Sequence, residues 1–477
     1  MKYIFYILKI FILFSLFYII SCEPDKDNDN SMSELDISIN KFIWEGMNFY
    51  YLWTDNVTNL DENKINTEQA RTDIADDEAD HKKFFNSLLY QPGIVDRFSF
   101  IIDNYIDFEK EIYSGISKSM GFDFQLYLLS YDGDEIIGEV KYVLKNSPAD
   151  KAHVKRGLLF TKIDGIVLTK SNFMELLSKE TYTLNNYLNS STYRLFAVEL
   201  QENPILIDTI YTRNSKKIAY LMYNQFVPDF DSAVNECFAR YKEKGIDELI
   251  VDLRYNSGGS MNSCINIASM ILDKSKKVLL KQEYNKNIQN LIVNKEGVES
   301  LIVYNTEYLI EADTTKKTPI NSLGLSKVYF ISSNRSASAS ELLINALSAH
   351  INIVVVGDET VGKNQGSITI KDEDRFGNVN GKHTWAIQPI IVQYVNNNNT
   401  FSIEPTKSII ELSGQLDVLG SVDEPLLSYT IGIIENNKKS LEIPFITPTY
   451  QYFKSIDDFK PYRKSMFIDI NMIKFKN

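Results

Sequence analysis

Cysteine and histidine are scarce in this chain of 477 residues, which contains 3 cysteines and 4 histidines. So few cysteines do not provide a disulfide framework. Cys237 and Cys264 lie in helix-like, partly apolar segments, where we expect buried thiols that act as small hydrophobic groups. The histidines do not have the spacing of zinc ligands; they are His81, His153, His350 and His383. The sequence therefore predicts neither a disulfide scaffold nor a metal site.

An excess of basic residues is also lacking, since 50 Lys and Arg stand against 63 Asp and Glu, for a formal net charge of -13. This balance argues against a nucleic-acid partner and against charge-driven binding to anionic membrane surfaces. Apolar residues, in contrast, make up 44% of the chain. A chain of this length and apolar content is expected to fold into two or three globular domains.

The first 21 residues, MKYIFYILKIFILFSLFYIIS, carry Lys2 ahead of a long apolar stretch that is interrupted by Lys9 and ends at the small residue Ser21. We interpret residues 1–21 as a signal peptide. The next residue, Cys22, completes an Ile-Ile-Ser-Cys sequence that resembles a bacterial lipobox, in which the peptidase cuts before a lipidated cysteine. Residues 22–32 would then be a solvated tether, and the protein would be lipid-anchored to a membrane of the bacterial cell envelope. A stretch of this length could instead remain as a transmembrane anchor.

The rest of the chain changes its pattern three times. Residues 33–112 are aromatic-rich with helical spacing and predict an N-terminal helical domain. The pattern of residues 115–200 predicts short strands and turns. Residues 215–435 alternate apolar strands with amphipathic helices, which predicts an α/β domain around a buried parallel sheet. Residues 436–477 form a C-terminal extension to which we assign no role.

Three serines at alternate positions occur in the segment 331–350, ISSNRSASASELLINALSAH. Ser338 and Glu341 together fit a capping box, in which the serine hydroxyl satisfies an N–H group of the first helical turn. A serine at the start of a helix is far more often a cap than a nucleophile. A chemical role for Ser338 therefore requires support from elsewhere in the chain. If Ser338 is a nucleophile, the N–H of Ala339 and the helix dipole could stabilise negative charge beside it.

Two glycines follow the apolar strand 248–253. Gly258 and Gly259 can adopt backbone conformations that leave N–H groups pointing at one spot, which would supply part of an oxyanion hole. A tight strand-to-helix turn that needs glycine for geometry alone would have the same sequence.

A serine nucleophile also needs a base. His350 lies three turns down the helix that begins near Ser338, and is therefore too far from it. Lys363, in the segment DETVGKNQGS, could act as a base if burial lowered its pKa by several units. A lysine in a loop after a strand is, however, ordinarily a solvated surface charge.

Taken together, VDLRYNSGG (251–259), SASASE (336–341) and VGKNQG (361–366) resemble motifs of the carboxyl-terminal processing, or tail-specific, peptidases. These are serine peptidases with a Ser/Lys dyad. The resemblance implies that Ser338, the middle serine and 25 positions before Lys363, is the nucleophile, with Ser336 and Ser340 serving as cap and packing. It also implies an α/β core of the crotonase-like superhelix type, preceded by an inserted PDZ domain.

The segment 115–200 itself resembles a PDZ domain, through Met120-Gly121-Phe122-Asp123 near a peptide-binding loop, Ser147-Pro148-Ala149 at a helix start, and Lys162-Ile163-Asp164-Gly165 at a hairpin turn. The resemblance implies that this domain captures an extended peptide by strand addition. It also implies that the four residues of the loop, Met120, Gly121, Phe122 and Asp123, bind substrate.

The sequence departs from the family at the position four residues after the lysine, where the family often carries a glutamine that orients the lysine. Ser367 stands there, and Gln365 is the candidate replacement. We predict a serine endopeptidase that cleaves polypeptides through an acyl-enzyme and needs no metal or organic cofactor. The alternatives are a non-catalytic peptide-binding lipoprotein on the same scaffold, and an esterase that uses the same dyad.

Overall fold

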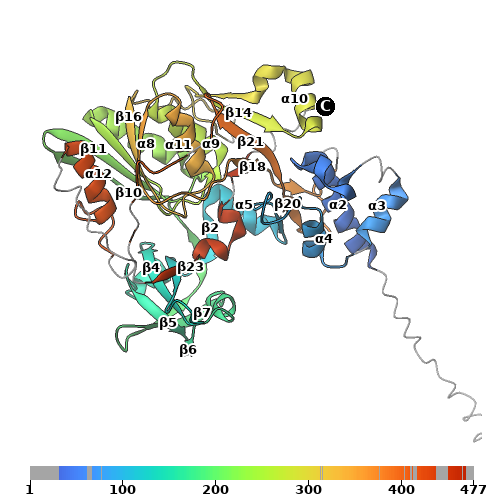
Figure 1. The fold of residues 1–477 in the computed structure, drawn as a ribbon, viewed down its shortest axis with the longest axis horizontal. Coiled ribbons are helices and arrows are strands. Elements are labelled where there is room, and N and C mark those ends of the chain that lie inside the picture. Colours follow the sequence, from blue (N-terminus) through green and yellow to red (C-terminus); the bar gives the residue numbers. More distant parts are fainter. Residues whose placement is uncertain are drawn as a thin grey trace, which may run out of the picture.

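The computed structural model describes residues 32–468 except 62–66, 77, 312, 314, 375–376, 402, 409–410, 412–415, 437–449 and 465. Within these residues the chain forms an N-terminal part (32–114), a β-domain (116–201) and a core (205–436), and segments of the C-terminal extension return to the last two (Figure 1). The proposed signal peptide and Cys22 lie outside the described residues. No helix in the described part of the chain is long and apolar enough to cross a membrane.

The N-terminal part is mainly helical, and the serine before its first helix accepts a hydrogen bond from the N–H of Asp36. Its elements are α2 (Glu34–Tyr50), α3 (Glu68–Ala75), α4 (His81–Ser87), β1 (Phe100–Ile102) and α5 (Tyr105–Ser114). Strand β1 joins a small sheet with two strands of the core, β20 (Ala386–Gln388) and β19 (Ile370–Lys371). This pairing fixes the segment after Asp96 against the core.

The β-domain contains an antiparallel sheet, a separate two-stranded sheet formed by its first and last strands, and its own hydrophobic cluster. Its elements are β2 (Ile116–Ser119), β3 (Phe122–Leu128), β4 (Ile136–Val143), α6 (Pro148–Lys151), β5 (Leu159–Ile163), β6 (Ile166–Val167), α7 (Phe173–Leu177), β7 (Thr181–Asn186), β8 (Thr192–Phe196) and β9 (Val198–Gln201). The expected hairpin turn is confirmed, because Asp164 and Gly165 connect β5 to β6 with φ of +54° and +79°. Strand β3 pairs with β4 on one side and with β23 (Gln451–Ser455) on the other.

The core contains a six-stranded sheet in which all strands after the first run parallel. In sheet order these are β10 (Ile205–Arg213), β11 (Lys216–Tyr223), β12 (Glu248–Asp252), β16 (Lys327–Ser332), β17 (Asn352–Gly357) and β22 (Lys407–Ser408). Strand β11 illustrates the burial of both faces, since Leu221 packs in one hydrophobic cluster and Tyr220 in another. Helices α8 (Asp231–Lys244), α9 (Met261–Ile271) and α11 (Ala339–Ser348) cover the first face, and α12 (Pro425–Glu435) covers the second.

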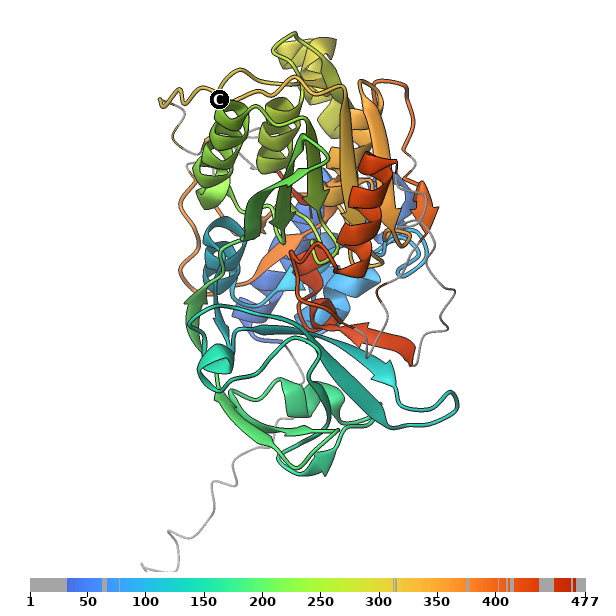
Figure 2. The same ribbon diagram turned by 90° about the vertical axis from the view of Figure 1, so that its left-hand side faces the viewer.

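A second core sheet lies at the side of the parallel sheet, and its strand order is β13-β24-β18-β21-β14-β15. These strands are β13 (Gly259–Ser260), β24 (Met466–Phe467), β18 (Gln365–Ser367), β21 (Ile390–Asn396), β14 (Val278–Tyr284) and β15 (Ile302–Tyr304), with α10 (Lys286–Glu296) beside them. The C-terminal extension therefore contributes a strand to this sheet and a strand to the β-domain (Figures 1 and 2).

Candidate catalytic site

Ser338 occupies the N-cap of α11, at the end of the loop that follows β16. Its backbone has φ +61° and ψ -115°, a conformation that is strained for any residue with a Cβ. The residue is completely buried, and its Oγ has no hydrogen-bond partner among the described residues. A strained backbone and an unpartnered buried hydroxyl are features of a functional serine more than of a structural one.

Glu341 joins the two segments that carry Ser338 and Lys363. Its Oε2 accepts hydrogen bonds from the N–H of Ser338 at 2.7 Å and from the N–H of Lys363 at 2.9 Å. Its Oε1 accepts from the N–H of Gly362 and from the hydroxyl of Thr360, each at 2.6 Å. Burial raises the pKa of Glu341, while these donors oppose the rise. The carboxylate thus holds the two loops side by side.

The neighbouring serines tie the loop to the end of β12. The hydroxyl of Ser336 donates to the carbonyl of Leu253 at 2.8 Å, and the hydroxyl of Ser340 donates to the carbonyl of Asn256 at 2.9 Å. Both serines are fully buried. The expectation that Ser336 caps the helix is wrong, because the N-cap position belongs to Ser338 and Ser336 lies two residues before it.

The glycine pair lies beside this loop, and both residues have φ near +125°, at +123° for Gly258 and +128° for Gly259. A Cβ on Gly259 would lie 2.3 Å from the carbonyl oxygen of Phe226, so glycine is required there. The N–H of Gly258 donates to Oδ1 of Asn256 at 2.9 Å. The Gly258 N–H is thus engaged within the turn, and Gly259, which pairs with Met466 of β24 in this structure, is the remaining candidate oxyanion donor of the two glycines. Ala339 is the first residue of α11, where a helical N–H has no acceptor within the helix.

Lys363 is completely buried, so the interpretation of it as a solvated surface charge is wrong. Burial lowers its pKa to about 7, although the charges of Asp96 and Glu341 oppose this shift. Its Nζ lies 4.6 Å from the ring centroid of Phe98, in the segment that β1 fixes against the core. A lysine with this pKa is largely neutral at slightly alkaline pH and can accept a proton.

The side chains of Lys363 and Ser338 are not hydrogen-bonded to each other. The Nζ of Lys363 instead donates to the carbonyl oxygen of Lys464, in the C-terminal extension, at 3.0 Å. The backbones on either side are nevertheless held together through Glu341. The two residues therefore lie on neighbouring segments, while the Lys363 amine is engaged by the C-terminal extension.

Gln365, the expected replacement for the family glutamine, makes no hydrogen bond to Lys363, and its buried Oε1 has no partner among the described residues. The residue at the family position, Ser367, accepts a hydrogen bond from Nε2 of Gln388 at 3.0 Å and donates to the carbonyl of Met466 at 3.1 Å. Gln388 comes from β20 and is completely buried. Sequence reasoning missed it because it is distant in the chain from the lysine motif.

The loop Met120-Gly121-Phe122-Asp123 lies at the start of β3 and is mostly buried. Asp123 binds Arg335, with Oδ1–Nη1 at 2.6 Å and Oδ2–Nη2 at 2.8 Å. The Nε of Arg335 donates to Asp457 of the C-terminal extension at 2.8 Å. Arg335 lies three residues before Ser338, so this buried ion pair connects the β-domain loop to the candidate nucleophile segment.

We expect Asp123→Ala to lower the free energy of unfolding by about 3–5 kcal/mol, because it leaves the buried guanidinium of Arg335 short of charge partners. Urea denaturation measures the effect. Glu180→Ala is the matched control, since its pair with Lys118 is exposed and should contribute less than about 1 kcal/mol. An equal loss of unfolding free energy in the two variants would show that the buried Asp123–Arg335 pair contributes no more than an exposed pair.

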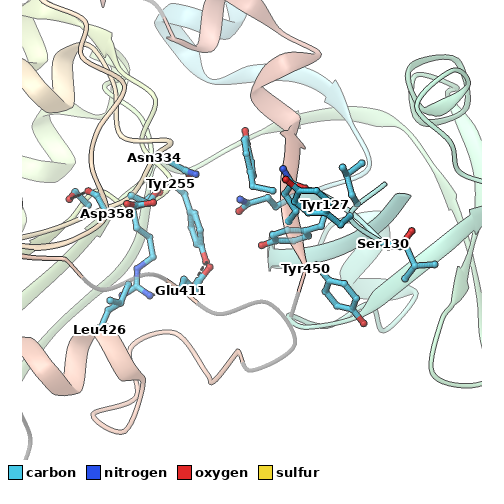
Figure 3. A pocket seen from close by; sticks show the side chains of 17 residues that line it. Tyr127, Ser130, Tyr255, Asn334, Asp358, Glu411, Leu426 and Tyr450 are labelled. Carbon is cyan, nitrogen blue, oxygen red and sulfur yellow. Dashed lines mark hydrogen bonds and ion pairs between the residues drawn. The ribbon is translucent and has the colours of Figure 1, made fainter. Parts of the chain in front are cut away.

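A cavity of about 500 Å³ separates the β-domain from the core. Figure 3 shows Tyr127, Ser130 and Tyr450 on one side, facing Tyr255, Asn334, Asp358, Glu411 and Leu426 on the other. Burial alone would raise the pKa of Glu411, but Lys141, Arg156 and Arg254 hold it well below its ordinary value. Lys141 and Arg156 belong to the β-domain and Arg254 to the core, so Glu411 bridges the two.

No group of three or more His, Cys, Asp or Glu residues in the described part of the chain is arranged to hold a metal ion. Cys237 and Cys264 are buried free thiols, as expected, and burial raises their pKa values.

Two sequence models of known families match the chain. The model of peptidase family S41 matches residues 217–407, and that of the peptidase S41 N-terminal domain matches residues 38–100. Together the matches contain the Ser338 and Lys363 segments and most of the N-terminal part that contacts them.

Curated relatives with similar sequences include a carboxyl-terminal-processing protease of Picosynechococcus sp., 25% identical over 234 residues, covering 47% of this chain and 50% of the relative. The carboxy-terminal processing protease CtpA of Bacillus subtilis is 24% identical over 237 residues, covering 48% and 46%. The chain thus spans about half the length of the curated relatives it matches.

Among solved structures, a putative S41 protease from Bacteroides fragilis is similar, with a TM-score of 0.60 and 20% identity over 83% of this chain and 97% of that one. This likeness supports the expected α/β peptidase fold with an N-terminal domain.

Proposed function

Because the chain belongs to peptidase family S41, we propose that it is a serine endopeptidase in which Ser338 is the nucleophile and Lys363 the general base. One observation carries this assignment. A buried lysine with a pKa of about 7 and a strained serine with an unpartnered hydroxyl are held side by side by the carboxylate of Glu341. A purely structural loop has no need for this combination.

In the proposed reaction, neutral Lys363 removes the proton from the Ser338 hydroxyl, and Oγ attacks the carbonyl carbon of the scissile peptide bond. The N–H groups of Ala339 and Gly259 stabilise the oxyanion of the tetrahedral intermediate. Protonated Lys363 then donates its proton to the leaving amine as the C–N bond breaks, which leaves an acyl-enzyme. Lys363 next activates a water molecule that hydrolyses the ester and restores the Ser338 hydroxyl.

The β-domain supports a role in polypeptide capture. Strand β3 accepts an antiparallel strand at its edge, as a PDZ domain does when it binds a peptide, and the loop of Met120 to Asp123 begins that strand. We therefore assign the β-domain as a PDZ-like domain that presents extended substrates, and the core as a crotonase-like peptidase domain. Residues 1–21 are proposed as a signal peptide and Cys22 as the lipid anchor to the cell envelope.

The second candidate function is a non-catalytic peptide-binding lipoprotein. The hydrogen bond from Lys363 to Lys464, in place of one to Ser338, favours it. The two functions differ in what happens to a bound polypeptide, which is cleaved by an endopeptidase and remains intact on a binding protein.

The test is mass spectrometry of an unfolded polypeptide incubated with the chain that begins after Cys22, or with its Ser338→Ala variant. We expect fragments from the wild type alone. Fragments from both proteins would remove Ser338 from the mechanism, and an intact polypeptide in both would favour the binding protein.

The rate of cleavage should rise with pH through about 7, because only neutral Lys363 accepts the proton of Ser338. Below this pH the rate should fall about tenfold per pH unit as the neutral fraction decreases. Initial rates between pH 5.5 and 9 measure the profile. A rate that is flat across this range would show that Lys363 is not the base.

A further inference from the structure

A strand of the C-terminal extension separates the two halves of the candidate catalytic site. Strand β13, which contains Gly259, and strand β18, which follows Lys363, are not paired with each other; β24 lies between them. It runs parallel to both, with Met466 opposite Gly259 and Phe467 opposite Ser260 and Ser367. An oxyanion donor and a general base must both reach a substrate carbonyl, so this gap is where an extended substrate has to lie.

The extension is held in this gap by specific contacts. The carbonyl of Lys464 accepts from Nζ of Lys363, the carbonyl of Met466 accepts from Ser367, and the N–H of Ile468 donates to the carbonyl of Ser367 at 3.0 Å. Residues 466–468 are almost completely buried. The ring of Phe467 packs edge-on against Tyr113 at 5.4 Å. The side chain of Lys363, the candidate base, is thus one of the hydrogen-bond donors that hold the extension in place.

The same extension also occupies the edge of the β-domain. Strand β23 pairs antiparallel with β3, from Gln451 opposite Leu128 to Ser455 opposite Gln125, and so runs towards the loop at the start of β3 (Figure 2). Phe453 packs edge-on against Phe173 of α7 at 5.3 Å. A strand in this direction, between β3 and a helix, has the geometry of a PDZ-bound peptide.

We propose that residues 450–468 are an intramolecular ligand of both peptide-binding surfaces, with β23 in the β-domain groove and β24 in the catalytic gap. This inference rests on the proposed function, since it assigns the gap as a substrate site. The extension keeps Lys363 bonded to Lys464 and away from Ser338, so the chain is held in an inactive arrangement. An extended polypeptide substrate displaces both strands and releases Nζ to Ser338.

Tethering explains how short strands can block the site. An intramolecular ligand acts at an effective concentration of the order of millimolar, so it competes well with a dilute substrate even when its own contacts are weak. Two linked strands must both be displaced before the site is fully open, which favours long unfolded polypeptides over short peptides.

The test uses a fluorescent synthetic peptide with the sequence of residues 450–468 and measures its binding by anisotropy. The receptor is the chain after Cys22 carrying Ser338→Ala, compared with the same chain that also carries Phe453→Asp and Phe467→Asp. Each aspartate places a charge in an aromatic contact and should expel the tethered strand. Leu188→Asp is the matched control, because it adds the same charge at a side chain that is 72% exposed.

We expect the peptide to bind the double-aspartate chain at least tenfold more tightly than Ser338→Ala alone, with the Leu188→Asp control unchanged. Equal binding to all three chains, or no binding to any of them, would overturn the proposal. Circular dichroism checks folding, and if the double variant does not fold, Phe453→Ala with Phe467→Ala replaces it under the same criteria.

Polypeptide cleavage separates this inference from the proposed function. In the background with Ser338 intact, the double-aspartate variant should cleave an unfolded polypeptide at least tenfold faster than the wild type. If the peptide binds as expected but neither the wild type nor the double-aspartate variant cleaves the polypeptide, the peptidase assignment is overturned. Cleavage at equal rates without a difference in peptide binding would overturn the intramolecular ligand and leave the peptidase assignment intact.

Discussion

Replacing Lys363 with methionine is expected to reduce the rate of polypeptide cleavage by about 10³-fold, in the range for removal of a general base. Methionine has a similar length and no proton-accepting amine, so it fills the buried site without supporting the reaction. Lys363→Arg should be equally inactive because an arginine stays protonated. Retention of more than a tenth of the wild-type rate in Lys363→Met would exclude Lys363 as the base.

The same variant has a second expected effect, on stability. The fall in the pKa of Lys363 from 10.5 to about 7 means that burying the charged amine costs ~5 kcal/mol below pH 7. Between pH 7 and 10.5 the unfolded chain binds the proton and the folded chain does not, so wild-type stability rises with pH. Lys363→Met removes this dependence. Its advantage over the wild type should therefore be largest below pH 7 and shrink by ~1.4 kcal/mol per pH unit above it.

Urea denaturation at pH 6 and pH 9 measures this difference, because other titrating groups are common to both proteins. The stability advantage of Lys363→Met should be about 2–3 kcal/mol smaller at pH 9 than at pH 6. An advantage that does not change with pH would show that Lys363 titrates at its ordinary value in the folded protein.

Glu341→Gln is expected to lower the free energy of unfolding by about 2–4 kcal/mol and the rate of cleavage by at least about 10²-fold. The carboxylate accepts from three N–H groups and one hydroxyl, whereas a glutamine has one acceptor oxygen and would point its amide hydrogens at some of these donors. Without this acceptor, the segments of Ser338 and Lys363 are no longer held together.

Glu359→Gln is the control, because Glu359 is exposed and lies in the same loop, two residues before Val361. This variant should change the free energy of unfolding by less than about 0.5 kcal/mol. Urea denaturation and cleavage rates are measured on both variants. If Glu341→Gln has the same unfolding free energy and cleavage rate as the wild type, the carboxylate does not organise the site.

Much of the core could be predicted from local sequence. The run Lys327–Ser332 is almost continuously apolar and forms a central parallel strand, as its pattern indicates. The position of Ser338 at the start of a helix follows from its capping-box sequence with Glu341. The capping-box pattern does not predict that the carboxylate of Glu341 also accepts a hydrogen bond from the N–H of Lys363, twenty-two residues away.

The environment of Lys363 could not be predicted, because three distant segments build it. Phe98 comes from the N-terminal part, Lys464 from the extension, and Gln388 reaches the neighbouring Ser367 from β20. A loop lysine between glycines looks solvent-exposed until these segments cover it. Likewise, Arg335 gives no local sign that it binds Asp123 of another domain.

The sequence of the extension predicts no role, because it resembles no motif of the family and its strands are short. Strand β24 contains two residues and β23 five, too few for a periodicity that distinguishes a strand from a loop. Their conformation is determined by the open edges of β3, β13 and β18, which are formed by sequence far away in the chain.

The most direct test of the Ser338/Lys363 assignment is the site and pH dependence of covalent modification by a fluorophosphonate, followed by intact mass and peptide mapping. It is made on the wild type and on the chain with Phe453→Asp and Phe467→Asp. The assignment predicts one adduct, at Ser338, that forms at a rate rising through about pH 7 and is slowed in Lys363→Met. An adduct at another residue, or no adduct on Ser338 in either chain, would contradict it.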